Sequence, residues 1–158
     1  MTLLEVKHLK KTYTGRFSTQ EVQALKDINF SVKKGEFGSI MGESGSGKRS
    51  LLNILATLDT ATAGEVMLEG RDLTEIKDSE ISDFRRDYLG FVFQDFNLLD
   101  NFSIKDNILL PLVLSNTPVP EMENRLMPII KKMNIDGLVN HFPYEVSGGQ
   151  KQRAAVAR

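Results

Sequence analysis

The sequence predicts an α/β protein in which N-terminal strands are followed by a helical part. Apolar and polar residues alternate over much of residues 3–32, as on strands that bury one face. A glycine-rich stretch at residues 42–50 lies between a short apolar run and a segment with apolar residues at helical spacing. Beyond residue 102, two longer segments again have helical spacing. We therefore expect strands, a glycine-rich loop and then helices, in that order.

Composition is typical of a globular domain. The chain has 158 residues, of which 41% are hydrophobic and 26% charged. The formal net charge of -1 gives no support to a nucleic-acid surface, so no nucleic-acid partner is expected. The absence of cysteine excludes disulfides and suits a reducing cytoplasm. No signal peptide is expected at the start, and Ile108–Leu114 is too short to span a bilayer, so the sequence does not predict a membrane protein.

Three strands are expected before the glycine-rich stretch. Leu3–Tyr13 has a weak alternating pattern, and a polar loop follows over Thr14–Glu21. The second strand spans residues 25–32 and ends at a Lys-Lys-Gly-Glu turn. Phe37–Met41 is predicted to be a short buried strand that leads into the glycine-rich stretch.

The glycine-rich stretch fits the phosphate-cradling pattern G-x-x-x-x-G-K-[ST] at every fixed position except the last. Its residues are Gly42, Glu43, Ser44, Gly45, Ser46, Gly47, Lys48, Arg49 and Ser50. The three glycines permit positive φ and a close backbone approach. Successive N–H groups can then converge on an anion at the positive end of the helix that follows, and Lys48 can reach the terminal phosphates.

The last position of the pattern departs from the rule. Ser or Thr normally follows the lysine, because its hydroxyl binds the Mg²⁺ of a bound nucleotide. Arg49 stands there and offers only donors and a positive charge. Ser50 comes next, but on a helix it points about 100° away. We expect phosphate binding with an impaired Mg²⁺ site.

The middle of the chain is predicted to return to the sheet. Glu65–Leu68 is expected to be a short strand that ends at the turn Glu69–Asp72, and Ser79–Tyr88 an exposed amphipathic helix. Leu89–Phe93 is a continuous apolar run, as in buried strands of a parallel sheet, and it leads directly to Gln94.

Helices are expected in the remainder. Ser103–Leu112 and Glu121–Met133 both read as amphipathic, and Ser103 with Asp106 predicts a capped N-terminus. After an irregular segment, Ser147 opens a final helix that continues to Arg158. The two histidines, His8 and His141, lack partners at metal-ligand spacing.

Four features occur in one order: Tyr13, the phosphate loop, Gln94 after a strand, and Ser147-Gly148-Gly149-Gln150 opening a helix. Together they resemble the nucleotide-binding subunit of an ATP-binding cassette (ABC) transporter. Residues 20–27, 52–55 and 90–94 resemble the bacterial group that exports antimicrobial peptides, macrolides or lipoproteins. The resemblance implies a P-loop NTPase-like core, with N-terminal antiparallel strands and a partial parallel sheet, and a helical subdomain. It also implies ATP hydrolysis coupled to transport by a separate membrane permease.

The resemblance assigns roles to particular residues. Tyr13 would stack on adenine, and Gln94 would touch Mg²⁺ or the attacking water and report to the permease. Ser147, Gly148, Gly149 and Gln150 would act in trans, on ATP held by a second copy in a head-to-tail dimer. The implied location is the cytoplasm, at the inner face of the cell membrane through the permease.

The resemblance also implies domain limits. Residues 1–94 would be a partial nucleotide-binding core, 95–146 the helical subdomain, and 147–158 the signature with the start of its helix. The sequence stops before the second acidic strand of the family, which supplies the Asp that holds Mg²⁺ and the Glu that activates water. An N-terminal part that is inactive alone is therefore expected.

Two alternatives stay open at this stage. One is a nucleotide-binding fragment or regulatory remnant without hydrolysis, which Arg49 favours. The other is a soluble ABC protein that acts on DNA or the ribosome. Such proteins usually carry coiled-coil insertions or tandem cassettes, and neither is present in the sequence.

Overall fold

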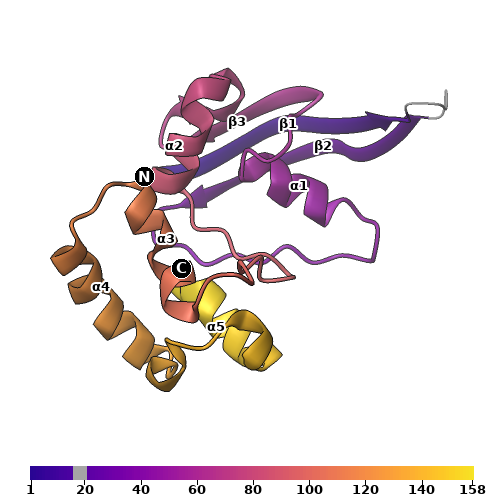
Figure 1. Cartoon of the computed structure of the whole chain (residues 1–158). Coiled ribbons are helices and arrows are strands. Elements are labelled where there is room, and N and C mark those ends of the chain that lie inside the picture. Colours follow the sequence, from indigo (N-terminus) through magenta and orange to yellow (C-terminus); the bar gives the residue numbers. More distant parts are fainter. Residues whose placement is uncertain (16–20) are drawn as a thin grey trace. The chain divides into compact units, whose positions relative to one another are not determined.

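The computed structural model describes residues 1–15 and 21–158 and divides into two compact units, Met1–Leu89 and Gly90–Arg158. Figure 1 shows the elements of both units. Most of the predicted loop at residues 14–21 lies outside the described residues.

The first unit is built on a four-stranded sheet with the order β2-β1-β3-β4, in which every pair is antiparallel. Its elements are β1 (Thr2–Thr14), β2 (Glu21–Lys33), α1 (Lys48–Leu55), β3 (Ala63–Leu68), β4 (Arg71–Asp72), the 3-10 turn η1 (Leu73–Glu75) and α2 (Asp78–Tyr88). The predicted N-terminal strands, the helix behind the glycine-rich loop and the helix near residue 80 are confirmed.

A bulge in β1 was not predicted. The pairing of β1 with β2 shifts between Val6 and Leu9, where His8 has a φ of 49°. Gly64 on β3 lies against this bulge, with a φ of 95°, and a Cβ there would clash with the carbonyl oxygen of His8. The extra residue changes which side chains face inward, so that Leu9 and Lys11 follow Val6 on the buried side. The bulge therefore places a lysine in the interior of the unit.

One hydrophobic core joins the sheet to α1 and α2. Its buried members are Val6, Leu9, Leu25, Leu51, Ile54, Val66, Leu73 and Phe84. Leu51 and Ile54 come from the inward face of α1, so burying this face holds the helix behind the glycine-rich loop against the strands.

Two predicted strands are absent from the described residues. Neither Phe37–Met41 nor Leu89–Phe93 is in strand conformation, and no described strand pair is parallel. The side chain of Phe37 is 95% exposed, in contrast to the predicted burial. A strand requires a neighbour to satisfy its backbone donors and acceptors, and among the described residues neither stretch has such a partner. The two strand predictions, and with them the partial parallel sheet, were wrong for this structure.

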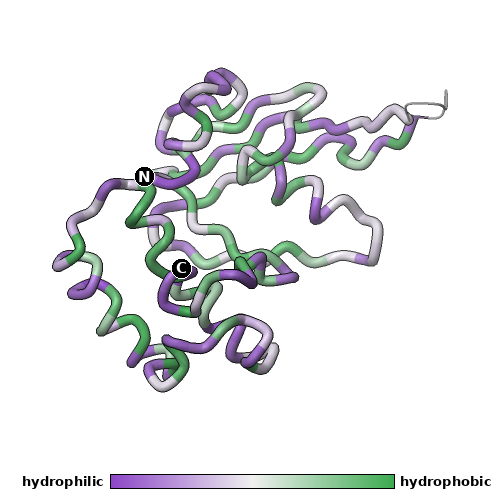
Figure 2. Tube along the Cα trace, in the orientation of Figure 1, coloured by the Kyte–Doolittle hydropathy of each residue, from purple (hydrophilic) through white to green (hydrophobic). Residues whose placement is uncertain are grey.

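The second unit is helical. Its elements are α3 (Ile104–Leu114), α4 (Val119–Lys132), the 3-10 turns η2 (Asp136–Leu138) and η3 (Pro143–Glu145), and α5 (Gly148–Ala157). Its buried core consists of Ile104, Ile108, Leu126, Ile130, Ile135, Val146 and Ala154. Figure 2 shows α3 as largely hydrophobic, whereas hydrophobic and hydrophilic residues alternate along α4. The amphipathic prediction therefore holds for α4 but not for α3.

Two polar side chains organise the start of α3. Ser103 and Asp106 form the predicted capping box, because each side chain pairs with the backbone N–H of the other. Asn107 is fully buried, and its amide accepts from the N–H of Leu99 at 2.7 Å and donates to three carbonyl oxygens of residues 99–103. Asn107 thereby fixes the segment that leads from Gln94 into the helices. Among the described residues, no helix has both the length and the apolarity needed to cross a membrane.

Candidate phosphate-binding site

The glycine-rich loop ends where α1 begins, at Lys48. Gly47 occupies the N-cap position in the left-handed region, and no side chain of the described residues caps this end of the helix. The first backbone N–H groups of a helix have no partner within the helix and carry its positive partial charge. The sequence therefore folds locally into a helix start without a side-chain cap, where the backbone N–H groups and the helix dipole favour an anion.

Glycine is required at two of the three glycine positions of the loop. Gly45 and Gly47 have φ values of 81° and 87°, which confirms the predicted positive φ. Gly47 also lies so close to β2 that a Cβ would clash with the carbonyl oxygen of Ala24. Gly42 is not among the described residues with positive φ, but a Cβ there would lie 2.7 Å from Ser46 Oγ. The Ser46 hydroxyl can rotate away from such a Cβ, so neither space nor backbone angle strictly requires glycine at position 42.

Lys48 directs its ammonium into this loop. Its Nζ donates to the carbonyl oxygens of Gly42 at 2.8 Å and Glu43 at 2.6 Å, and to Ser46 Oγ at 3.2 Å. These oxygens are neutral acceptors, and a phosphate oxygen would be a stronger one because it is charged. The glycine-rich loop, the Lys48 ammonium and the start of α1 together fit a phosphate group.

The residues beside Lys48 do not fit a Mg²⁺ ion held in the usual way. Arg49 is the second residue of α1 and is exposed, and it has no oxygen to offer as a ligand. Ser50 has a hydroxyl, but its Oγ lies 3.1 Å from the hydroxyl oxygen of Tyr13. No group of three or more His, Cys, Asp or Glu side chains in the described part of the chain is arranged to hold a metal ion.

Tyr13 lies near the phosphate loop, at the end of β1, and its side chain is 40% exposed. Its hydroxyl donates to Asp59 Oδ2 at 2.7 Å, in addition to its contact with Ser50. The other carboxylate oxygen, Oδ1, accepts from Lys11 Nζ at 2.6 Å. The Lys11 ammonium also lies 4.8 Å from the centre of the Tyr13 ring, on one face. Two residues that the sequence analysis missed, Lys11 and Asp59, therefore surround the predicted base-binding tyrosine.

Electrostatics keep the Asp59 carboxylate charged. Burial alone would raise the pKa of Asp59, but hydrogen bonds from Lys11, Tyr13 and the backbone N–H of Thr60 lower that pKa below its ordinary value. Lys11 is only 8% exposed, and its ammonium has a second acceptor in the carbonyl oxygen of Thr60 at 2.7 Å. The pair is a partly buried, hydrogen-bonded link between β1 and the segment after α1.

The other predicted site residues belong to the second unit. Gln94 is exposed in a turn that the N–H of Phe96 closes on the carbonyl oxygen of Phe93, at 3.1 Å. Ser147 is the N-cap of α5 and forms a capping box with Gln150, and Gly148 and Gly149 are exposed in the first turn. The predicted position of the signature at a helix start is confirmed, whereas its role and that of Gln94 stay predictions.

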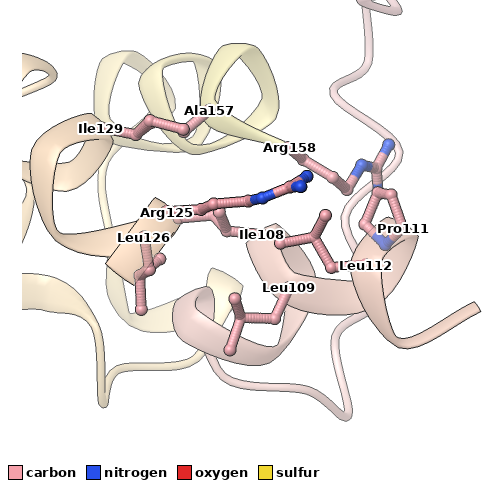
Figure 3. A pocket seen from close by; sticks show the side chains of 9 residues that line it. All are labelled: Ile108, Leu109, Pro111, Leu112, Arg125, Leu126, Ile129, Ala157 and Arg158. Carbon is pink, nitrogen blue, oxygen red and sulfur yellow. The ribbon is translucent and has the colours of Figure 1, made fainter. Parts of the chain in front are cut away.

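An apolar cavity of about 190 Å³ in the second unit contains none of the predicted site residues. It lies between α3, α4 and the end of α5 (Figure 3). Arg125 and Arg158 extend along it, but Arg125 pairs with Glu121 and Arg158 donates to the carbonyl oxygen of Asn97 at 2.7 Å. Both guanidinium groups are thus engaged by neighbouring protein groups.

Comparison with known proteins identifies the family. Residues 25–158 match the family described as ABC transporter. The chain belongs to the ABC transporter family. It is 50% identical over 156 residues, 99% of its length, to the ABC transporter ATP-binding protein YxdL of Bacillus subtilis (strain 168). It is 43% identical over its full length to the bacitracin export ATP-binding protein BceA of Halalkalibacterium halodurans. It spans 60% and 62% of the lengths of these two relatives.

A solved structure supports the same fold. The ATP-binding cassette MJ0796, in a dimeric post-hydrolysis state bound to ADP and Pi, is 38% identical and has a TM-score of 0.90. This similarity covers 98% of the present ABC chain and 68% of the MJ0796 chain. The predicted ABC ATPase fold and the predicted resemblance to export ATP-binding proteins are therefore confirmed.

Proposed function

We propose that this chain is the ATP-binding part of an ABC-type export subunit, and that the phosphate loop binds ATP and ADP. The geometry of the loop carries the proposal. The Lys48 ammonium and the start of α1 meet at one glycine-rich backbone loop, where three positions carry no side chain.

The proposed roles of the other site residues follow from the family. Tyr13 would stack on the adenine, because its ring stands partly exposed beside α1. Gln94 would report to a separate membrane permease, and the signature at α5 would act on ATP bound by a second copy, arranged head to tail. The dimeric state of MJ0796 supports, by analogy, the presence of a second copy. Through the permease, the subunit would lie at the cytoplasmic face of the membrane.

Mg²⁺ dependence is the feature in which this chain would differ. With Arg49 in place of a hydroxyl residue, and Ser50 engaged with Tyr13, the metal contributes less to nucleotide binding than in a chain with Ser after the lysine. The guanidinium supplies positive charge near the phosphates, but it cannot coordinate a cation.

Calorimetric titration of ATP into the full chain, with and without Mg²⁺, tests the proposal. We expect binding in both conditions with little enhancement by the metal. The Arg49→Ser variant restores a hydroxyl at that position, so it should gain affinity only when Mg²⁺ is present. Absence of ATP binding to the wild type would refute the proposed function. A large Mg²⁺ enhancement in the wild type would refute only the impaired metal site.

A further inference from the structure

We propose that Asp59 and Lys11 are positioning residues that hold the Tyr13 ring as a fixed platform for the nucleotide base. The proposal rests on the proposed function, because it requires that the site binds a nucleotide. The observation behind it is that the Tyr13 hydroxyl donates to the Asp59 carboxylate at 2.7 Å, while Lys11 donates to the same carboxylate. We call these hydrogen bonds the tether.

The tether restricts the ring in two ways. A tyrosine on a strand end has two side-chain torsions, and a hydrogen bond from its hydroxyl to a charged acceptor fixes both. The ammonium of Lys11 occupies one face of the ring at 4.8 Å from its centre, so a base must use the opposite face. Asp59 thus sets the direction of the ring, and Lys11 sets which face is available.

The tether also joins the ring to both ends of α1. Near the start of the helix, Ser50 Oγ lies 3.1 Å from the tyrosine hydroxyl. At the end of the helix, the N–H of Asp59 donates to the carbonyl oxygen of Asn53 at 3.2 Å. The base platform and the phosphate loop are therefore attached to the same short helix. Such a connection fixes the distance between the two ends of a bound nucleotide.

Preorganisation of this kind affects affinity through the base and not through the phosphates. A ring that is already immobilised loses little freedom when a base binds, whereas a released ring must be ordered at that moment. Tripolyphosphate has no base, so its binding should not depend on the tether. A general loss of stability would weaken the binding of both ligands alike. The ratio of ATP affinity to tripolyphosphate affinity therefore reports on the tether.

The test measures both affinities by calorimetry for Tyr13→Phe and Asp59→Asn. Tyr13→Phe keeps the stacking ring and removes only the hydroxyl, and Asp59→Asn keeps the shape but removes the charge. We expect each variant to weaken ATP roughly 2-fold to 10-fold, as for the loss of one net hydrogen bond, with tripolyphosphate unchanged. The double variant should bind ATP no more weakly than the weaker-binding single variant, because both substitutions act on the same Tyr13–Asp59 hydrogen bond. Tyr88→Phe, on the ring that stacks on Phe84 in α2, is the matched control.

The outcomes separate the two proposals. If Tyr13→Phe binds ATP as tightly as the wild type while Tyr13→Ala binds it more weakly, the tether does not position the ring and the inference is overturned, although stacking stands. If ATP and tripolyphosphate weaken together in Asp59→Asn, the carboxylate supports only the fold, and the inference is again overturned. Failure of the wild type to bind either ligand would overturn the proposed function and the inference with it.

Discussion

The chain starts two helices with glycine-containing sequences, and the two starts are built differently. At α1, Gly47 is the N-cap in a left-handed conformation, and no side chain of the described residues caps the helix. At α5, Ser147 is the N-cap, and its side chain and that of Gln150 satisfy each other's backbone N–H groups. One end has no side-chain cap, and the other is capped by its own side chains.

This difference bears on anion binding, but an end without a side-chain cap is not by itself an anion site, because the N-cap residues of α2 and α4, Lys77 and Pro118, also make no side-chain cap hydrogen bond. A capped end is stable without a ligand, whereas an uncapped end gains stability when a ligand supplies the missing acceptor. At α1 the Lys48 ammonium donates to three neutral oxygens of the described loop, so a phosphate offers it a better partner.

The largest effect is expected from adding a methyl group at the glycines. Gly47→Ala combines a positive φ with a clash against Ala24, so we expect unfolding free energy to fall by about 2–4 kcal/mol. Gly149→Ala, in the first turn of α5, has no described atom within 4 Å of the added methyl and should stabilise by up to about 1 kcal/mol. Urea denaturation of both variants measures the effect. Equal changes in unfolding free energy for the two variants would contradict the proposed difference between the starts of α1 and α5.

The next effect concerns nucleotide affinity. Lys48→Ala removes a charged donor from the uncapped helix start, and charged hydrogen bonds contribute about 1.5–3 kcal/mol, so ATP affinity should fall roughly 10-fold to 100-fold. Lys151→Ala is the matched control, since Lys151 is near the start of α5. Calorimetric titration at low protein concentration should show wild-type affinity for the control. A similar loss in both variants would mean that overall charge, and not the loop, binds the nucleotide.

Removal of the α5 cap should have a smaller effect. Ser147→Ala deletes the cap, and such changes typically cost about 0.5–2 kcal/mol of stability. Ser79→Ala provides a control, because Ser79 lies in the first turn of α2 without being its N-cap. The midpoint of urea denaturation should decrease for Ser147→Ala and hardly change for Ser79→Ala. Unchanged stability of Ser147→Ala would show that α5 does not depend on its cap.

The smallest effect is a difference in pH dependence. The pKa of Asp59 is lowered in the folded chain, so the stability from its contacts with Lys11 and Tyr13 is present near neutral pH. That stability is lost as the pH falls below about 4 and through the lowered pKa. The Ser147–Gln150 cap does not titrate. Denaturation curves should therefore show that the difference in unfolding free energy between the wild type and Asp59→Asn decreases as the pH falls. The difference between the wild type and Ser147→Ala should stay constant.

Sequence patterns predicted the features that depend on neighbouring residues. The Ser103–Asp106 capping box and the positive φ of Gly45 and Gly47 are local, and the structure has them all. The alternating pattern also located β1, but it could not reveal the bulge at His8, which depends on the close approach of Gly64 across the sheet. A pattern of alternate residues assumes an unbroken register.

Features that depend on distant partners were missed. Asp59 is 46 residues from Tyr13, and no local signal connects the two. The apolar run Phe37–Met41 predicted a buried strand, because apolar content indicates burial but not the presence of a neighbouring strand. The same limit applies to Leu89–Phe93.

The exposed run before the phosphate loop also has a chemical consequence. Met41 is 88% exposed and directly precedes Gly42, whereas Met122 on α4 is buried. Mild peroxide converts an accessible thioether into a polar sulfoxide, and methionine sulfoxide reductases reverse the reaction. Mass spectrometry of the two peptides would then compare an open thioether with an enclosed one within a single sample. The rate at which Met41 oxidises therefore reports, without any label, whether the residues directly before the phosphate loop are covered.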